Sequence, residues 1–298
     1  MYFCVMQIEI DSHSGFCYGV TKTVQLAEEA LSHGKPVYCL GEIVHNEEEV
    51  ERLKSKGLII IEKEDLKDIA GANILIRAHG EPNSTYQCIE KGSNQLYDGT
   101  CPIVLQLQKK VRNTWTDLKS KNGLVIIYGK KGHAEVVGLA GQTNDEATII
   151  TTFEELESID FSRPIAIFAQ TTQSIGGYDT IVAEIRRRMS TFFPNGEIPL
   201  QVTDSICRHV SKRGEHLKEF SGKHDVIVFV SGTNSSNGKV LFEVCRRNNP
   251  NSFWVPNTKG VKNEWFTNAN SVGICGATST PRWLMEAVAE KIRAITNN

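Results

Sequence analysis

Three cysteines have surroundings that suit metal chemistry. Cys17, Cys101 and Cys207 each follow a turn-like stretch and each precede a helical pattern. Thiolate is a preferred ligand of zinc and of iron–sulfur clusters, and three thiolates at one point match three corners of a four-iron cluster. A structural zinc site takes four protein ligands instead. The pattern therefore favours an iron–sulfur cluster whose fourth iron is left open to bind and reduce a substrate.

The other five cysteines have apolar or helical neighbours, and we expect them to be small buried side chains. They are Cys4, Cys39, Cys88, Cys245 and Cys275. The chain contains no Cys-x-x-Cys, the local signature of zinc ribbons, thioredoxin-like redox pairs and ferredoxin-type clusters. Disulfides are not expected, because a chain of 298 residues can build its own hydrophobic cores.

Two polar turn positions recur after each of the three cysteines, which indicates a threefold repeat. His45 and His79 lie 28 and 62 residues after Cys17, His133 and Thr171 lie 32 and 70 after Cys101, and Ser235 and Ser279 lie 28 and 72 after Cys207. The repeats predict an α/β fold of three similar parallel-sheet domains in a pseudo-three-fold arrangement around a central cluster. Their predicted bounds are residues 1–98, 99–204 and 205–298, the last including a C-terminal helix.

Each repeat has the same order of predicted elements. A helix follows the cysteine, then come a short strand, a polar turn and a second helix, and a further strand and turn close the repeat. The strands are expected at 36–40, 124–128 and 226–230, the second helices at 47–54, 136–140 and 239–246, and the closing strands from 74, 165 and 272. Ligands of parallel sheets gather beyond the carboxyl ends of the strands, where the polar turns lie.

The side chains of these turns suit a phosphate or diphosphate group, because many small donors beside helix starts form an anion pocket. The candidates are His45, His79, His133, Thr171, Thr172, Ser235, Ser236, Asn237 and Ser279. The one carboxylate at such a turn is Glu135, which burial would allow to deliver a proton near neutral pH. Two simpler interpretations stay open: Glu135 as an exposed first-turn residue, and Ser235 as a helix cap.

Composition excludes several classes of function. The formal net charge is −2 without a basic stripe, so no nucleic-acid partner is expected. The longest apolar runs are the size of strands, too short to cross a membrane. The first residues lack the basic segment of a signal peptide, so a cytoplasmic location is expected.

Eight short motifs, in order, resemble the 4-hydroxy-3-methylbut-2-enyl diphosphate reductase family, also called IspH or LytB. They are Gly15-Phe16-Cys17, Glu42-Ile43-Val44-His45-Asn46, Ala78-His79-Gly80, Thr100-Cys101-Pro102, Gly132-His133-Ala134-Glu135, Gln170-Thr171-Thr172, Asn234-Ser235-Ser236-Asn237 and Gly276-Ala277-Thr278-Ser279. The resemblance runs from about residue 8 to residue 290.

The resemblance implies a [4Fe–4S] cluster on Cys17, Cys101 and Cys207 whose open iron binds the substrate hydroxyl. It implies reductive dehydroxylation to isopentenyl and dimethylallyl diphosphate, the last step of the non-mevalonate isoprenoid pathway. Glu135 would drive protonation with help from Thr171 and His133, and the turn side chains named above would hold the diphosphate. The electron donor would be ferredoxin or flavodoxin.

Two positions depart from the family pattern. Val210 stands where many members have threonine, which alters the hydrogen bonding around the third cysteine, and Gly99 replaces a common alanine. Three other classes remain as alternatives: a dehydratase of the quinolinate synthase type, a non-catalytic iron–sulfur sensor and a zinc-binding α/β hydrolase. The first would need arginines at the turns, where this chain has histidines and hydroxyl groups.

Overall fold

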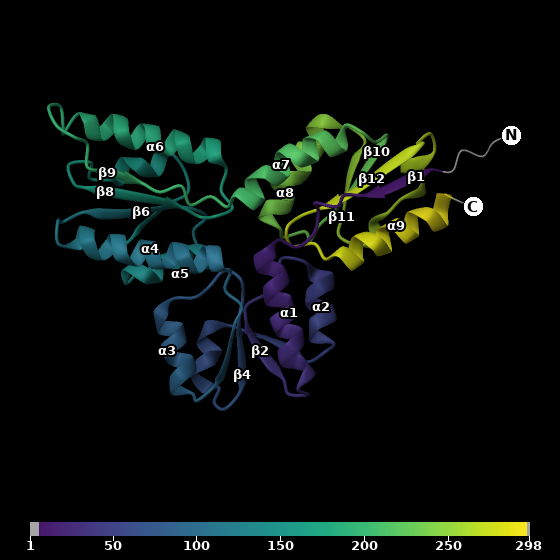
Figure 1. The fold of residues 1–298 in the computed structure, drawn as a ribbon, viewed down its shortest axis with the longest axis horizontal. Helices are drawn as coiled ribbons and strands as arrows, with labels where there is room; N and C mark the ends of the chain where they lie inside the picture. Colours follow the sequence, from purple (N-terminus) through teal and green to yellow (C-terminus); the bar gives the residue numbers. More distant parts are fainter. Residues whose placement is uncertain (1–5, 297–298) are drawn as a thin grey trace. The chain divides into compact units, whose positions relative to one another are not determined.

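The computed structural model describes residues 6–296 and contains three four-stranded α/β sheets (Figure 1). The chain divides into two compact units. The first unit comprises Met1–Ile60 and His209–Asn298, and the second comprises Ile61–Arg208.

One complete sheet lies in the first unit. Its strands are β1 (Gln7–Ile10), β10 (Val226–Val230), β11 (Ser252–Val255) and β12 (Ser271–Gly276), in the order β1-β12-β10-β11 and all parallel. Helices α7 (Arg208–Ser221) and α8 (Ser236–Asn248) cover one face, and α9 (Arg282–Thr296) covers the other (Figure 1). Successive residues of β10 point to opposite faces, so the strand is apolar throughout.

The second unit contains a sheet with the same construction. Its strands are β6 (Leu124–Tyr128), β7 (Thr148–Ile150), β8 (Ile165–Ala169) and β9 (Leu200–Val202), in the order β7-β6-β8-β9 and all parallel. Helices α4 (Pro102–Lys119) and α5 (Ala134–Ala140) pack on one face, and α6 (Ile175–Ser190) packs on the other (Figure 1).

The remaining elements belong to the third sheet and its surroundings. They are α1 (Tyr18–Ser32), β2 (Val37–Leu40), α2 (Glu47–Lys54), β3 (Leu58–Ile61), β4 (Asn73–Ile76), α3 (Asn83–Lys91) and β5 (Gln95–Asp98). Short 3-10 helices span Lys63–Asp68, Gly141–Thr143, Glu154–Ser158, Thr258–Gly260 and Asn263–Phe266. Strands β2 to β5 form this sheet, in which β4 and β5 run parallel.

The two complete sheets share one topology. Counted along the chain from β10 in the first unit and from β6 in the second, the first strand lies between the second and the third. The third strand also pairs with a fourth strand at the edge of the sheet. The fourth strand of the second unit is β9, which follows β8 in sequence, whereas the first unit takes its fourth strand from the N-terminal segment, β1. The β4–β5 pair repeats the contact between third and fourth strands.

The predicted α/β class with parallel sheets is confirmed, as are the strands at 124–128 and 226–230. Two helices begin earlier than predicted, α5 at Ala134 and α8 at Ser236, because His133 and Ser235 cap them. The three domain bounds and the pseudo-three-fold arrangement stay predictions. The pairing of β1 with β12 was not expected from the sequence.

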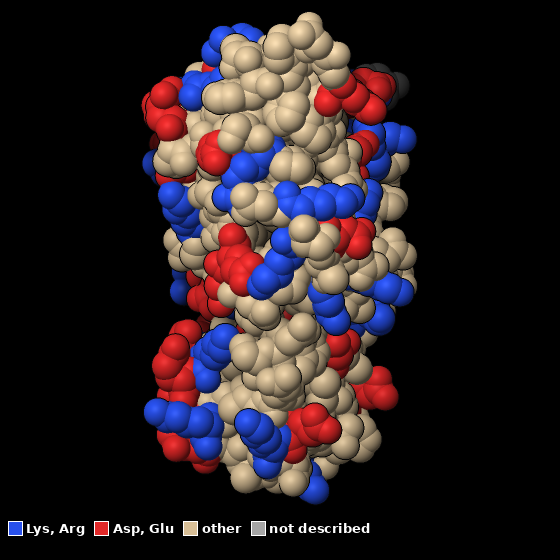
Figure 2. Space-filling view, turned by 90° about the vertical axis from the view of Figure 1, so that its left-hand side faces the viewer, with Lys and Arg blue, Asp and Glu red and all other residues tan. Residues whose placement is uncertain are grey.

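Charged side chains are mixed on the surface. Figure 2 shows one side of the molecule, where lysine and arginine stand among aspartate and glutamate instead of gathering by sign. Many are paired within a helix turn, as Arg188 and Glu184 are at 2.7 Å on α6. Within residues 6–296, no helix combines the length and the apolar composition needed to cross a membrane.

Candidate functional site

Cys17, Cys101 and Cys207 occupy equivalent structural positions. Each is half-buried and stands immediately before a helix: α1, α4 and α7 respectively. The backbone N–H of each donates to the carbonyl of a residue that lies two positions after the end of β12, β4 or β8, each the third strand of its sheet in the order given above. The pairs are Cys17 with Thr278 after β12 at 3.2 Å, Cys101 with Ala78 after β4 at 3.0 Å, and Cys207 with Thr171 after β8 at 2.8 Å.

In the second unit, Thr171 connects Cys207 to a buried carboxyl group. The carbonyl of Thr171 accepts from Cys207. Its backbone N–H donates to Glu135 Oε1 at 2.6 Å, and its hydroxyl donates to Glu135 Oε2 at 2.9 Å. Glu135 is only 2% exposed, and burial raises its pKa to about 7 although both hydrogen bonds from Thr171 lower it. This carboxyl group can hold or release a proton near neutral pH.

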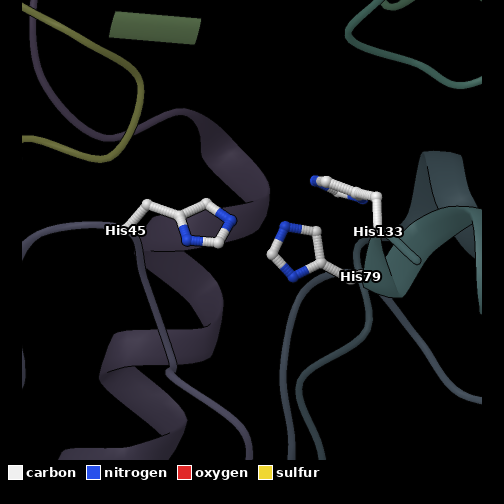
Figure 3. Close-up of side chains that lie close together, drawn as sticks. All are labelled: His45, His79 and His133. Carbon is white, nitrogen blue, oxygen red and sulfur yellow. The ribbon is translucent and has the colours of Figure 1, made fainter. Parts of the chain in front are cut away.

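His133 joins the same group of residues. It caps α5, where its Nδ1 accepts from the N–H of Glu135 at 3.2 Å. A neutral ring that accepts at Nδ1 carries its proton on Nε2. The rings of His133 and His79 meet edge to face with centroids 5.1 Å apart (Figure 3). The second unit thus brings together five predicted residues, with Cys207 at one end and the two imidazoles at the other.

Glycine next to His79 is favoured by the backbone conformation and by close packing. Gly80 has a φ of +69°, and a Cβ there would lie 2.6 Å from the side-chain nitrogen of Gln108. A Cβ there would also lie 2.9 Å from Thr100 Cγ2, and any side chain would be strained by the left-handed backbone conformation.

In the first unit, Ser235, Ser279 and His45 lie together. The Ser235 hydroxyl caps α8 by accepting from the N–H of Gly238 at 3.0 Å, and it lies 3.4 Å from the hydroxyl of Ser279. Ser279 Oγ in turn donates to the carbonyl of His45 at 3.3 Å. Gly232 permits this approach, because a Cβ on it would lie 2.5 Å from the same carbonyl.

Asn237 forms hydrogen bonds to Thr278, whose carbonyl accepts a hydrogen bond from the backbone N–H of Cys17. Its Oδ1 accepts from the N–H of Thr278 at 3.3 Å and from the Thr278 hydroxyl at 3.0 Å. Thr278 then accepts from Cys17 through its own carbonyl. Asn237 is therefore two hydrogen bonds away from the cysteine, within the first turn of α8.

Two predicted residues are exposed. Ser236 begins α8 with its side chain in solvent, and Thr172 lies in the exposed turn after β8, where its hydroxyl accepts from Gln170 at 3.0 Å. The simpler interpretations are partly right, because Ser235 is a helix cap. The exposed first-turn interpretation of Glu135 is wrong, since that side chain is buried.

The remaining cysteines mostly pack as expected. Cys39, Cys245 and Cys275 are buried, and the sulfurs of Cys245 and Cys275 lie 3.9 Å apart in the core of the first unit. The prediction for Cys88 is wrong: it is half-exposed, because its neighbour Ile89 takes the buried position on α3. Cys4 lies outside the described residues.

Sequence reasoning missed Arg213. This residue of α7 is half-buried, and its Nη1 donates to the carbonyl of Gly15, two residues before Cys17, at 2.6 Å. Burial lowers its pKa. With Lys212, it is one of two cationic side chains that line a hollow of about 350 Å³, which Cys17 also lines. A sequence signal was present, since His209, Arg213 and His216 lie four and three residues apart on one helical face.

These features define a parallel α/β protein with three equivalently placed cysteines and a buried acid. Residues 8–293 match the LytB protein family, so the chain belongs to that family. The resemblance found in the sequence motifs is thereby confirmed.

Curated relatives cover nearly the whole chain. The 4-hydroxy-3-methylbut-2-enyl diphosphate reductase of Bacteroides thetaiotaomicron is 44% identical, with 98% of this chain and 99% of that protein aligned. The protein of the same name from Porphyromonas gingivalis is 43% identical over 98% of this chain and all of its own length.

Solved structures agree. The structure of (E)-4-hydroxy-3-methyl-but-2-enyl diphosphate reductase, described as the terminal enzyme of the non-mevalonate pathway, matches with a TM-score of 0.74 and 31% identity over 97% of this chain and all of that one. The reductase from Plasmodium falciparum shares the fold, with a TM-score of 0.77 at 24% identity over 95% of this chain and 86% of its own.

Proposed function

We propose that this protein reduces 4-hydroxy-3-methylbut-2-enyl diphosphate to isopentenyl and dimethylallyl diphosphate, with release of water. The family membership and the reductase relatives support the reaction. One structural observation carries the proposal. The backbone N–H of each of the three cysteines forms the same hydrogen bond to a carbonyl after a strand, and Cys207 connects through Thr171 to Glu135, whose pKa is raised to about 7.

The three cysteines suit an iron–sulfur cluster. Each stands at the start of a helix, where the positive end of the helix dipole favours a negatively charged ligand group, and each is partly accessible. We propose that Cys17, Cys101 and Cys207 each give one ligand to a [4Fe–4S] cluster. When bound, the cluster supplies electrons and one iron without a protein ligand that can act as a Lewis acid.

The polar turns would hold the diphosphate. In the first unit, hydrogen bonds already link Ser235 to Ser279 and Ser279 to the carbonyl of His45. Asn237 is held separately by its hydrogen bonds from Thr278, so these turns are ordered before a ligand arrives. Exposed Ser236 stands in the same turn. In the second unit, His79, His133 and Thr172 would make the corresponding contacts.

Glu135 is the proposed proton donor. Loss of the hydroxyl group as water consumes two electrons and two protons, one joining the departing oxygen and one joining carbon. Glu135 is partly protonated at neutral pH because burial raises its pKa to about 7. Its Oε2 touches the hydroxyl of Thr171, which can accept that proton and pass on its own, and His133 fixes the start of α5.

The reductant is proposed to be ferredoxin or flavodoxin, since the reaction takes up two electrons that the chain's own side chains do not supply. A reduced viologen dye can replace either protein in an assay.

The test is cysteine replacement under anaerobic conditions. Cys17→Ser, Cys101→Ser and Cys207→Ser are each expected to lose most cluster absorbance and reductase activity. Cys88→Ser and Cys245→Ser serve as matched controls and should keep both, because they pack within helices away from the docking carbonyls. Full iron and sulfide content in any of the three variants would remove that residue from the ligand set and refute the cluster assignment.

A further inference from the structure

We propose that the first unit carries a second metal site, for a divalent transition metal, formed by Asp11, His13 and His216. Their ligand atoms all lie within 4.8 Å of one another. The ligand group includes none of the three cysteines, although Cys17 lines the same hollow as His13 and His216. None of its residues has a part in the proposed reduction.

The distances suit tetrahedral coordination. Asp11 Oδ1 lies 2.9 Å from His216 Nε2 and 3.8 Å from His13 Nδ1. Zinc bonds to nitrogen and oxygen of about 2.0–2.1 Å place neighbouring ligand atoms roughly 3.3 Å apart. The two observed distances lie on either side of that value, so side-chain adjustments of a few tenths of an ångström would complete the set.

Asp11 is held in place for this role. It follows β1 and is 2% exposed, and its backbone N–H donates to the carbonyl of Ile274 in β12 at 2.8 Å. Oδ2 accepts from the Ser14 hydroxyl at 2.6 Å, which leaves Oδ1 turned toward the two imidazoles. Oδ1 also accepts from the backbone N–H of His13 at 3.0 Å, which fixes the carboxylate against the turn that carries His13.

A metal would replace a hydrogen bond that already exists. His216 Nε2 and Asp11 Oδ1 are now joined at 2.9 Å, and a cation between them would take the place of the shared proton. The rings of His13 and His216 have centroids 3.9 Å apart, so the two imidazoles are close enough to share one metal ion.

The ligand types identify the metal class. Two imidazoles and one carboxylate suit zinc or ferrous iron and leave open positions, while calcium and magnesium prefer oxygen ligands. The open positions would face the hollow of about 350 Å³ that His13 and His216 line together with Lys212 and Arg213. These two cationic side chains would attract water-derived hydroxide or another small anion to the metal.

The test is zinc binding by the anaerobically purified, cluster-containing protein, measured in competition with a chromophoric chelator. Wild type should bind one equivalent of zinc without losing iron. His13→Ala and His216→Gln should each weaken that binding at least about 10-fold, since even the partners of metal ligands are worth 10- to 100-fold. His209→Ala is the matched control, because this exposed histidine lines the same hollow but lies outside the ligand group, and it should bind as wild type does.

Two readouts separate this site from the cysteines and from misfolding. X-ray absorption of the bound zinc should show nitrogen and oxygen neighbours only, and zinc should raise the melting temperature of wild type and His209→Ala but not of His13→Ala. His13 is exposed, so its loss leaves the core intact. A sulfur shell around zinc, or equal affinity in wild type, His13→Ala and His216→Gln, would overturn the proposal.

Discussion

Replacing Glu135 by glutamine tests both the proposed proton donor and the physical reason for its properties. The amide reproduces the protonated carboxyl: its oxygen can accept from the backbone N–H of Thr171, and its NH₂ can donate to the Thr171 hydroxyl. The variant should therefore fold, bind the cluster and bind substrate. It cannot release a proton, so turnover should fall at least about 100-fold, the lower end of general acid catalysis.

Stability should change with pH in a defined direction. The folded carboxyl group has a pKa of about 7 against an ordinary value of 4.5, so between these pH values the folded chain holds a proton that the unfolded chain loses. The contribution of this group to the stability of wild type is therefore fully present below pH 4.5 and is lost as pH rises through about 7. At 1.4 kcal/mol per pKa unit, the loss is between about 3 and 4 kcal/mol. Glu135→Gln carries no such loss.

The assay is the difference in melting temperature between Glu135→Gln and wild type from pH 5 to pH 8.5, both in the same cluster state. The variant should become progressively more stable than wild type as pH rises. Glu146→Gln is the control, because Glu146 is exposed and its ion pair with Lys119 lowers its pKa, so its removal should bring no gain at high pH. A constant difference across the range, or turnover within a few-fold of wild type, would refute the reasoning.

Three further substitutions follow from the same contacts. Asn237→Ala should raise the Michaelis constant about 10- to 100-fold with the cluster intact, as expected for loss of a hydrogen bond to a charged group; unchanged binding in titrations would place the diphosphate elsewhere. Thr171→Val removes the hydroxyl that lowers the pKa of Glu135, so the basic limb of the pH–rate profile should move to higher pH. Arg213→Gln removes a cation from the hollow that Cys17 lines, and the cluster's reduction potential, followed by electron paramagnetic resonance, should become more negative.

The centres of the sheets could be predicted from sequence, whereas their edges could not. Strands β6, β8 and β10 are apolar runs of five residues, because helices bury both of their faces. Strand β1 alternates exposed and half-buried residues and is four residues long, and its partner β12 begins 264 residues later, since Gln7 pairs with Ser271. No local pattern can carry that information.

The candidate site shows the same division. Turn positions could be found because they follow recognisable strands: His45, His133 and Ser235 each stand five residues after the end of a first strand. The helix caps explain why two helix starts were misplaced, since a capping side chain makes its first hydrogen bonds before apolar periodicity begins. The roles of Arg213 and Asp11 depend on contacts between segments about 200 residues apart, which only the fold supplies.

The position of β1 gives the cysteines a common structural meaning. Cys101 follows β5 and Cys207 follows β9, each the fourth strand of its sheet, and Cys17 follows β1, which is the fourth strand of the sheet formed with β10 to β12. Each cysteine then docks on the turn after the third strand next to it. In structural terms a cysteine therefore ends each repeat rather than beginning it, and the third repeat is completed by the first residues of the chain.

A parallel pair of neighbouring strands places both carboxyl ends at the same edge, so one hydrogen bond suffices to fix the cysteine beside the turn that carries His79, Thr171 or Ser279. The same local geometry, made three times by unlike sequences, is what a ligand set of three equivalent thiolates requires.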